Sequence, residues 1–116
     1  MGAAYLLPRI VGLAKATELL LTGDFVSASE AAAMGLYNRV VPADALAATT
    51  KEFAERLAAG PAFALAKTKE MLNREMQMDL ATALETEAQA QALCMQHTDF
   101  REAYDAFTAK RPAKFK

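Results

Sequence analysis

The sequence predicts a mainly α-helical fold of about six helices with one short β-strand. Most segments repeat apolar residues at three- or four-residue spacing, the period of one helix face. Capping residues and glycines mark the segment boundaries, and only one stretch is rich enough in β-branched residues for a strand. With 53% apolar residues over 116 positions, the chain has the composition of one ordered domain or part of one.

Residues 1–23 predict a short helical segment followed by a regular helix. Ala3–Ile10 is expected to form a helical turn or two, with Pro8 near a helix start or a kink because proline lacks the amide hydrogen. Gly12–Thr22 is expected to be helical, and Gly23 ends it. The apolar face of this helix comprises Leu13, Ala16, Leu19 and Leu20.

A capping box begins the next helix. The Ser27 hydroxyl can accept from the Glu30 amide, while the Glu30 carboxylate can accept from the Ser27 amide. The predicted helix Ala28–Met34 ends at Gly35, and Tyr37–Val41 then predicts the single strand. We expect this strand to pair with a segment outside the sequence or with another chain.

The remaining residues predict four helices. Asp44 is expected to cap Ala45–Ala59, and Gly60-Pro61 separates that helix from Ala62–Arg74. The other two helices are Leu80–Gln96, capped by Asp79, and a last helix that begins at a capping pair of Asp99 and Glu102 and runs to about Lys110. The last helix is expected to turn inward Phe100, Ala103, Tyr104 and Phe107.

Composition argues against several classes of function. The 13 basic and 14 acidic residues give a net charge of −1, whereas a nucleic-acid-binding protein normally carries a basic face. No apolar run approaches the length of a membrane span. The single Cys94 excludes an internal disulfide and fits a reducing compartment, so we expect a cytoplasmic protein. With one cysteine and one histidine, His97, the chain is not expected to build a zinc site.

Three motifs, in this order and spacing, resemble the C-terminal part of the enoyl-CoA hydratase/isomerase (crotonase) superfamily. They are Gly-Ala-Ala-Tyr-Leu-Leu-Pro-Arg-x-x-Gly at 2–12, Leu-Thr-Gly-Asp at 21–24 with the Ser-Ala-x-Glu-Ala box, and Ala-Phe-x-x-Lys-Arg at 106–111. The resemblance implies that 1–42 forms the end of a catalytic core with its connecting helices. Residues 43–116 would form a helical oligomerisation region, and the catalytic β/α core itself would be missing.

The resemblance also implies the reaction class. Such enzymes hydrate or isomerise an acyl-CoA thioester, holding the developing enolate with two backbone amides and moving protons with carboxylates. In the family these groups precede the matched segment, so no catalytic residue is expected in this chain, and the chain alone is expected to be inactive. Glu18, Asp24 and Glu30 have simpler roles as an ion-pair partner, a turn residue and a cap.

The resemblance points to Phe107 and Lys110 as residues that bind coenzyme A. In the family, an aromatic ring and an ammonium at these positions reach the adenine and phosphate end of the CoA moiety of the substrate. The alternative is that Phe107 is a core residue and Lys110 is a cation favoured by the helix dipole. Arg111 and Lys114 extend the positive patch without an assigned role.

Partners and cofactors follow from the same resemblance. The expected partners are an acyl-CoA thioester and further copies of the chain, in trimers or hexamers, with no metal and no prosthetic group. A different hypothesis is a non-catalytic helical interaction domain that assembles with a separate chain. Four methionines could serve a promiscuous binding surface, although flexible core or interface packing is the simpler interpretation: Met71, Met76, Met78 and Met95.

Overall fold

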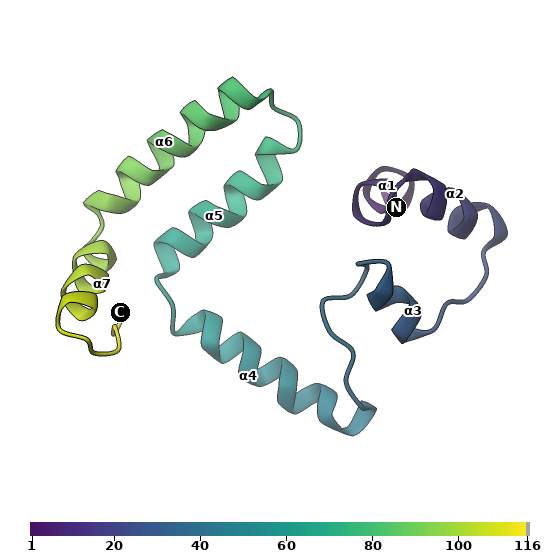
Figure 1. The fold of residues 1–116 in the computed structure, drawn as a ribbon, viewed down its shortest axis with the longest axis horizontal. Helices are drawn as coiled ribbons and strands as arrows, with labels where there is room; N and C mark the ends of the chain where they lie inside the picture. Colours follow the sequence, from purple (N-terminus) through teal and green to yellow (C-terminus); the bar gives the residue numbers. More distant parts are fainter. Residues whose placement is uncertain (116) are drawn as a thin grey trace. The chain divides into compact units, whose positions relative to one another are not determined.

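The computed structural model describes residues 1–115. Over these residues the chain forms seven α-helices and one short 3-10 helix, η1, as Figure 1 shows. The chain divides into two compact units, Met1–Ala47 and Ala48–Lys116, and the boundary falls in the first turn of α4 (Leu46–Ala58). The mainly helical prediction is confirmed.

In the first unit, α1 (Ala3–Val11) packs against α2 (Leu13–Thr22), with Ala16 of α2 fully buried. Gly12 joins them with φ 82° and ψ 157°, a conformation that residues with a side chain rarely adopt. Pro8 lies inside α1 rather than near its start. Because proline has no amide hydrogen, α1 lacks the bond to the Ala4 carbonyl, while the ladder after Pro8 continues to the Gly12 amide, which donates to the Pro8 carbonyl at 3.1 Å.

The capping box of α3 (Ala28–Ala33) is confirmed. The Ser27 amide donates to Glu30 Oε2 at 2.8 Å, and the Glu30 amide donates to Ser27 Oγ at 3.2 Å. The Ser27 and Glu30 amides have no acceptor within the helix itself, so these two hydrogen bonds fix where α3 begins. The Ser27 hydroxyl, and then the Ser27 amide, lower the pKa of the Glu30 carboxyl.

The predicted strand at Tyr37–Val41 is wrong. These residues form an irregular segment between α3 and η1 (Ala43–Ala45), and residues 1–115 contain no strand. The physical reason is pairing: a strand needs a neighbouring backbone to take its hydrogen bonds, and no extended partner exists in the described part of the chain. β-branched composition alone therefore does not produce a strand here.

Asp44 does not cap the following helix as predicted. It lies inside η1, whose first turn is closed by the Ala45 amide donating to the Pro42 carbonyl at 3.0 Å. The N-cap of the 3-10 turn is Pro42, two residues before the expected cap, because Pro42 has an extended conformation suited to a helix start.

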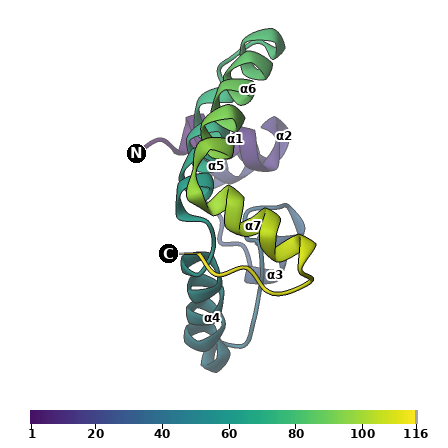
Figure 2. The same cartoon turned by 90° about the vertical axis from the view of Figure 1, so that its left-hand side faces the viewer.

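In the second unit, α5 (Ala62–Glu75) and α6 (Leu80–Gln96) run side by side in opposite directions, as both views show (Figures 1 and 2). The predicted Asp79 cap is confirmed, since Asp79 Oδ1 accepts from the Thr82 amide at 2.9 Å. The helix α7 (Thr98–Thr108) follows after a single junction residue and packs on α6.

That junction residue corrects the predicted cap of α7. His97, not the Asp99–Glu102 pair, caps the helix: its Nδ1 accepts from the Asp99 amide at 3.3 Å. Asp99 already lies in the first turn of α7, buried to 9% exposure, with its carboxylate 3.3 Å from the same Nδ1. The helix starts one residue before Asp99 because α6 ends at Gln96 and leaves His97 in an extended conformation.

Most of the predicted apolar faces remain exposed in this chain. Among the described residues, the buried apolar side chains are Ala16, Ala31, Met71 and Ala106. The expectation that α7 turns its aromatic residues inward is wrong, because the helix has too few neighbours to cover them. The exposed fractions are 45% for Phe100, 61% for Tyr104 and 85% for Phe107.

None of the helices in residues 1–115 combines the length and apolar character that crossing a membrane requires.

Candidate functional site

The carboxyl end of α7 is built as a Schellman motif. The Lys110 amide donates to the Phe107 carbonyl at 3.1 Å, and the Arg111 amide donates to the Ala106 carbonyl at 3.0 Å. These bonds satisfy two carbonyls that a helix end would otherwise leave open, and they reverse the chain direction within two residues. The motif connects the backbone of both predicted CoA-binding residues.

Lys110 occupies the position of this motif that glycine normally fills. Its φ is 50°, and it is the one residue other than glycine with positive φ among residues 1–115. A side chain costs about 1 kcal/mol in this left-handed conformation. Lys110 therefore holds a conformation that glycine would adopt without this cost.

Phe107 lies on the last turn of α7 and is 85% exposed. No segment among residues 1–115 covers the Phe107 ring. The site thus presents an open aromatic ring one helical turn before the lysine.

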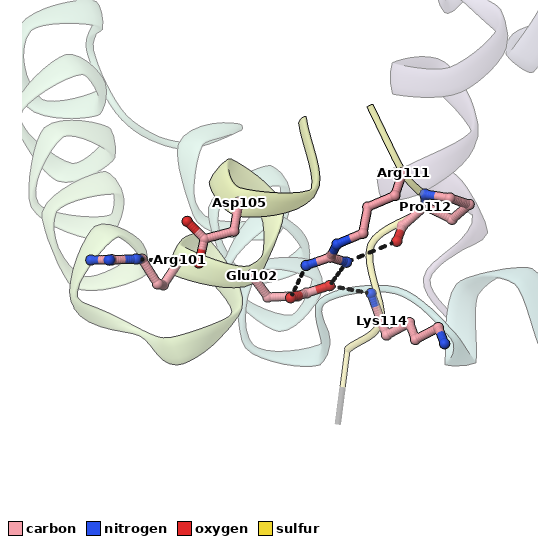
Figure 3. Close-up of polar contacts among 6 residues, drawn as sticks. All are labelled: Arg101, Glu102, Asp105, Arg111, Pro112 and Lys114. Atoms are coloured by element: carbon pink, nitrogen blue, oxygen red, sulfur yellow. Dashed lines mark hydrogen bonds and ion pairs between the residues drawn. The ribbon is translucent and has the colours of Figure 1, made fainter. Parts of the chain in front are cut away.

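Glu102 holds the segment that follows α7. Its two carboxylate oxygens accept from Arg111 Nη1 at 2.6 Å and Nη2 at 2.9 Å, a bidentate pair. Oε1 also accepts from the Lys114 backbone amide at 2.7 Å. Figure 3 shows Arg111 and Lys114 converging on Glu102 from the tail, while Arg101 and Asp105 pair on α7 itself.

These contacts stabilise the ionised form of the Glu102 carboxyl group. The Arg111 guanidinium, followed by the Lys114 amide, lowers the pKa of Glu102 from 4.5 to about 2. In return, Glu102 raises the pKa of Arg111. Arg111 is therefore neutralised by a carboxylate, and it does not extend the positive patch as the sequence suggested.

The acidic residues near the first motifs keep the simple roles expected for them. Lys15 Nζ forms an ion pair with Glu18 Oε2 at 2.8 Å, and the Glu30 carboxylate is part of the capping box. The Asp24 backbone amide donates to Thr22 Oγ1 at 3.3 Å in the turn after α2. The structure does not bring these three acids together into a proton-transfer site.

A groove of about 310 Å³ lies between α5 and α6 and includes Met71, Glu75 and Cys94. Of the four methionines considered above, Met71 is buried, whereas Met76 and Met95 are about half exposed. The group is therefore divided between packing and surface rather than gathered on one face.

Sequence reasoning missed the role of Glu102. Its partners lie nine and twelve positions further along the chain, outside the spacing of any helix pattern. The available signal was Pro112, which lies shortly beyond the end of α7, together with the cations on either side of it, because a reversed tail brings such cations back over the helix.

Comparisons with known proteins agree with the motifs. The family model described as enoyl-CoA hydratase/isomerase matches residues 1–116. The 1,2-epoxyphenylacetyl-CoA isomerase of Escherichia coli K12 is 38% identical over 114 residues, covering 98% of this chain and 44% of the relative. The crotonyl-CoA hydratase of Syntrophomonas wolfei has the same identity and the same coverage.

Solved structures that are similar to this chain are also enoyl-CoA hydratases or hydratase/isomerases. The enoyl-CoA hydratase of Bacillus anthracis superposes with a TM-score of 0.94 at 36% identity, over 99% of this chain and 45% of that protein. The enoyl-CoA hydratase/isomerase of Cupriavidus metallidurans CH34 superposes with a TM-score of 0.92 at 38% identity, over 99% and 43%. The chain spans about 44% of the length of the two curated relatives named above. It belongs to the enoyl-CoA hydratase/isomerase family.

Proposed function

We propose that this chain is the C-terminal part of an enzyme that hydrates or isomerises an enoyl-CoA in the cytoplasm, as in β-oxidation of fatty acids. Within that enzyme, it covers the acyl pocket, contributes the subunit interface of a trimer or hexamer, and binds the nucleotide end of CoA. We also propose that 43–116 is the oligomerisation region and that the chain alone does not turn over substrate.

The relatives support coenzyme A as the shared part of the substrate. One relative is named for an epoxyphenylacetyl group and another for a crotonyl group, yet both names specify a CoA thioester. A segment that is similar in both is better suited to the common nucleotide than to the differing acyl groups.

The observation that carries the proposal is the open end of α7. Phe107 is 85% exposed, and Lys110 adopts a positive φ that favours glycine. An uncovered aromatic face can stack on adenine, and an ammonium can neutralise a phosphate. Both features make groups suited to a nucleotide accessible at the end of α7.

Isothermal titration of CoA into the chain tests the proposal. We expect binding that weakens about fivefold or more in each of the variants Phe107→Ala and Lys110→Ala, the effect of losing one stacking or charged contact. The chain should not hydrate crotonyl-CoA. Turnover by the chain, or CoA binding unchanged in both variants, would contradict the proposal.

The second candidate is a non-catalytic helical domain that assembles with a separate chain. It is favoured by the large apolar side chains left exposed, such as Leu13 at 72%, Leu21 at 81% and Leu80 at 75%. Assembly without any CoA binding would favour this candidate over the first.

A further inference from the structure

We propose that Glu102 is a positioning residue for coenzyme binding, which acts by docking the chain beyond α7 so that Lys110 is held at its site. This inference rests on the proposed function of Lys110. We call Glu102, the Arg111 guanidinium and the Lys114 backbone amide the Glu102 clamp. Nothing in the family comparisons assigns a role to these three groups.

The first step of the argument is geometric. Lys110 lies between the end of α7 and Arg111, so its backbone is fixed from both sides. The Schellman bonds hold it to the helix, and the clamp holds the chain that follows it. Contacts at nine and twelve residues from Glu102 close this segment into a loop over α7 (Figure 3).

The second step concerns strain. A lysine with φ of 50° reverts easily to an ordinary conformation once the following chain is released. The three clamp hydrogen bonds, at 2.6, 2.9 and 2.7 Å, oppose that release. A conformation that is strained locally persists only where its surroundings hold it, and here the surroundings are the Schellman bonds on one side and the clamp on the other.

The third step is the division of charge. Arg111 Nη1 and Nη2 both donate to the Glu102 carboxylate, so the Arg111 guanidinium is used to dock the tail. The proposed function assigns phosphate neutralisation to the Lys110 ammonium. The affinity for CoA then depends on how well the Lys110 backbone is ordered before the ligand arrives.

Two pairs of variants test the proposal, each with a matched control on α7. Glu102→Gln and Asp105→Asn both remove one negative charge that acts on Arg111, but Asp105 is hydrogen-bonded to Arg101 at 3.3 Å, whereas Glu102 is hydrogen-bonded to the tail. Arg111→Lys and Arg101→Lys both preserve charge but lose the guanidinium. Simple attraction between charges predicts that both acid variants bind the polyanionic CoA more tightly.

We expect the opposite for the clamp. CoA binding, measured by titration calorimetry, should weaken about fivefold in Glu102→Gln and in Arg111→Lys, while the two control variants stay within about twofold of the unchanged chain. In addition, Lys110→Ala should weaken binding less in the Glu102→Gln background than alone, because the two residues act through one element.

The outcomes separate this inference from the proposed function. If Lys110→Ala weakens CoA binding but Glu102→Gln and Arg111→Lys do not, the clamp is overturned and the proposed function stands. If CoA does not bind the unchanged chain, both fail. Amide exchange at Lys114, measured by NMR, should speed up in Glu102→Gln while exchange at the amides inside α7 stays unchanged, and the two readouts together show that the variant released the tail rather than unfolded the helix.

Discussion

The Phe63 ring stacks on the His97 imidazole, with centroids 4.7 Å apart and planes 3° from parallel. Phe63 lies in the first turn of α5, and His97 is the single residue between α6 and α7. One contact therefore joins three helices of the second unit at the point where α7 starts.

His97 has two separable roles, as cap and as stacking partner. Asparagine retains a side chain that can cap a helix, whereas alanine does not. We expect His97→Asn to lower the free energy of unfolding modestly, and His97→Ala to lower it by about 1 kcal/mol more, the usual value of a cap. Urea denaturation followed by circular dichroism measures both. Phe63→Leu removes the stack alone and should match His97→Asn; equal stability of the two His97 variants would exclude the capping role.

Replacing Lys110 by glycine should stabilise the protein and weaken ligand binding together. Glycine relieves the positive φ, which is worth about 1 kcal/mol, and removes the ammonium. We expect a higher melting temperature and weaker CoA binding than in the unchanged chain. Lys110→Ala is the control, because it removes the charge but keeps the unfavourable backbone. No gain in melting temperature for the glycine variant relative to alanine would contradict the assignment of strain.

The docked tail should depend on pH in a narrow acidic window. Arg111 holds the folded-state pKa of Glu102 at about 2, below its ordinary value of 4.5. Because the pKa is lowered, the ionised carboxylate favours the docked tail above pH 4.5, and this contribution is lost as pH falls toward 2. The chemical shift of the Lys114 amide should follow this titration. In Arg111→Gln the midpoint should move up toward 4.5; a midpoint near 4.5 in the unchanged chain would show that the ion pair does not form in solution.

The Ser27–Glu30 capping box should control local opening of α3. Ser27→Ala removes the acceptor of the Glu30 amide, and we expect that amide to exchange about fivefold faster, equivalent to about 1 kcal/mol. Ser29→Ala is the nearest control, because Ser29 lies inside the helix and does not accept from this amide, although its hydroxyl contacts the capping Ser27 Oγ at 3.1 Å. Hydrogen exchange by NMR compares the two. Equal protection in both variants would rule out the cap as the element that holds the start of α3.

Exposed apolar side chains should drive self-association. Phe25 is fully exposed, and Leu21, Leu80 and Phe107 are each at least 75% exposed. We expect sedimentation velocity to show concentration-dependent oligomers that persist at high salt, since burial of apolar surface is not screened as ion pairs are. A single monomeric species at every concentration would contradict this.

Local features were predictable from the sequence wherever both partners lie within one helical turn. The Ser27–Glu30 box and the Asp79 cap were predicted and are confirmed, because helix geometry alone brings such residues together. Asp44 and Asp99 satisfy the same composition rule but lie inside their helices. The residues two positions earlier, Pro42 and His97, are the N-caps of those helices. A rule that considers one residue type at a time cannot decide which of two nearby residues becomes the cap.

The sequence alone determined membership of the enoyl-CoA hydratase/isomerase family and the mainly helical class, because ordered motifs and short-range periodicity can be read directly from the chain. The pair Phe107 and Lys110 stays a prediction that follows from the family resemblance. Only the tertiary structure decided that Phe107 is open to solvent, that Tyr37–Val41 is not a strand, and that Glu102 receives Arg111 and Lys114. These outcomes depend on which segments come to lie beside one another, and a contact across nine or twelve residues exists only after the chain has reversed.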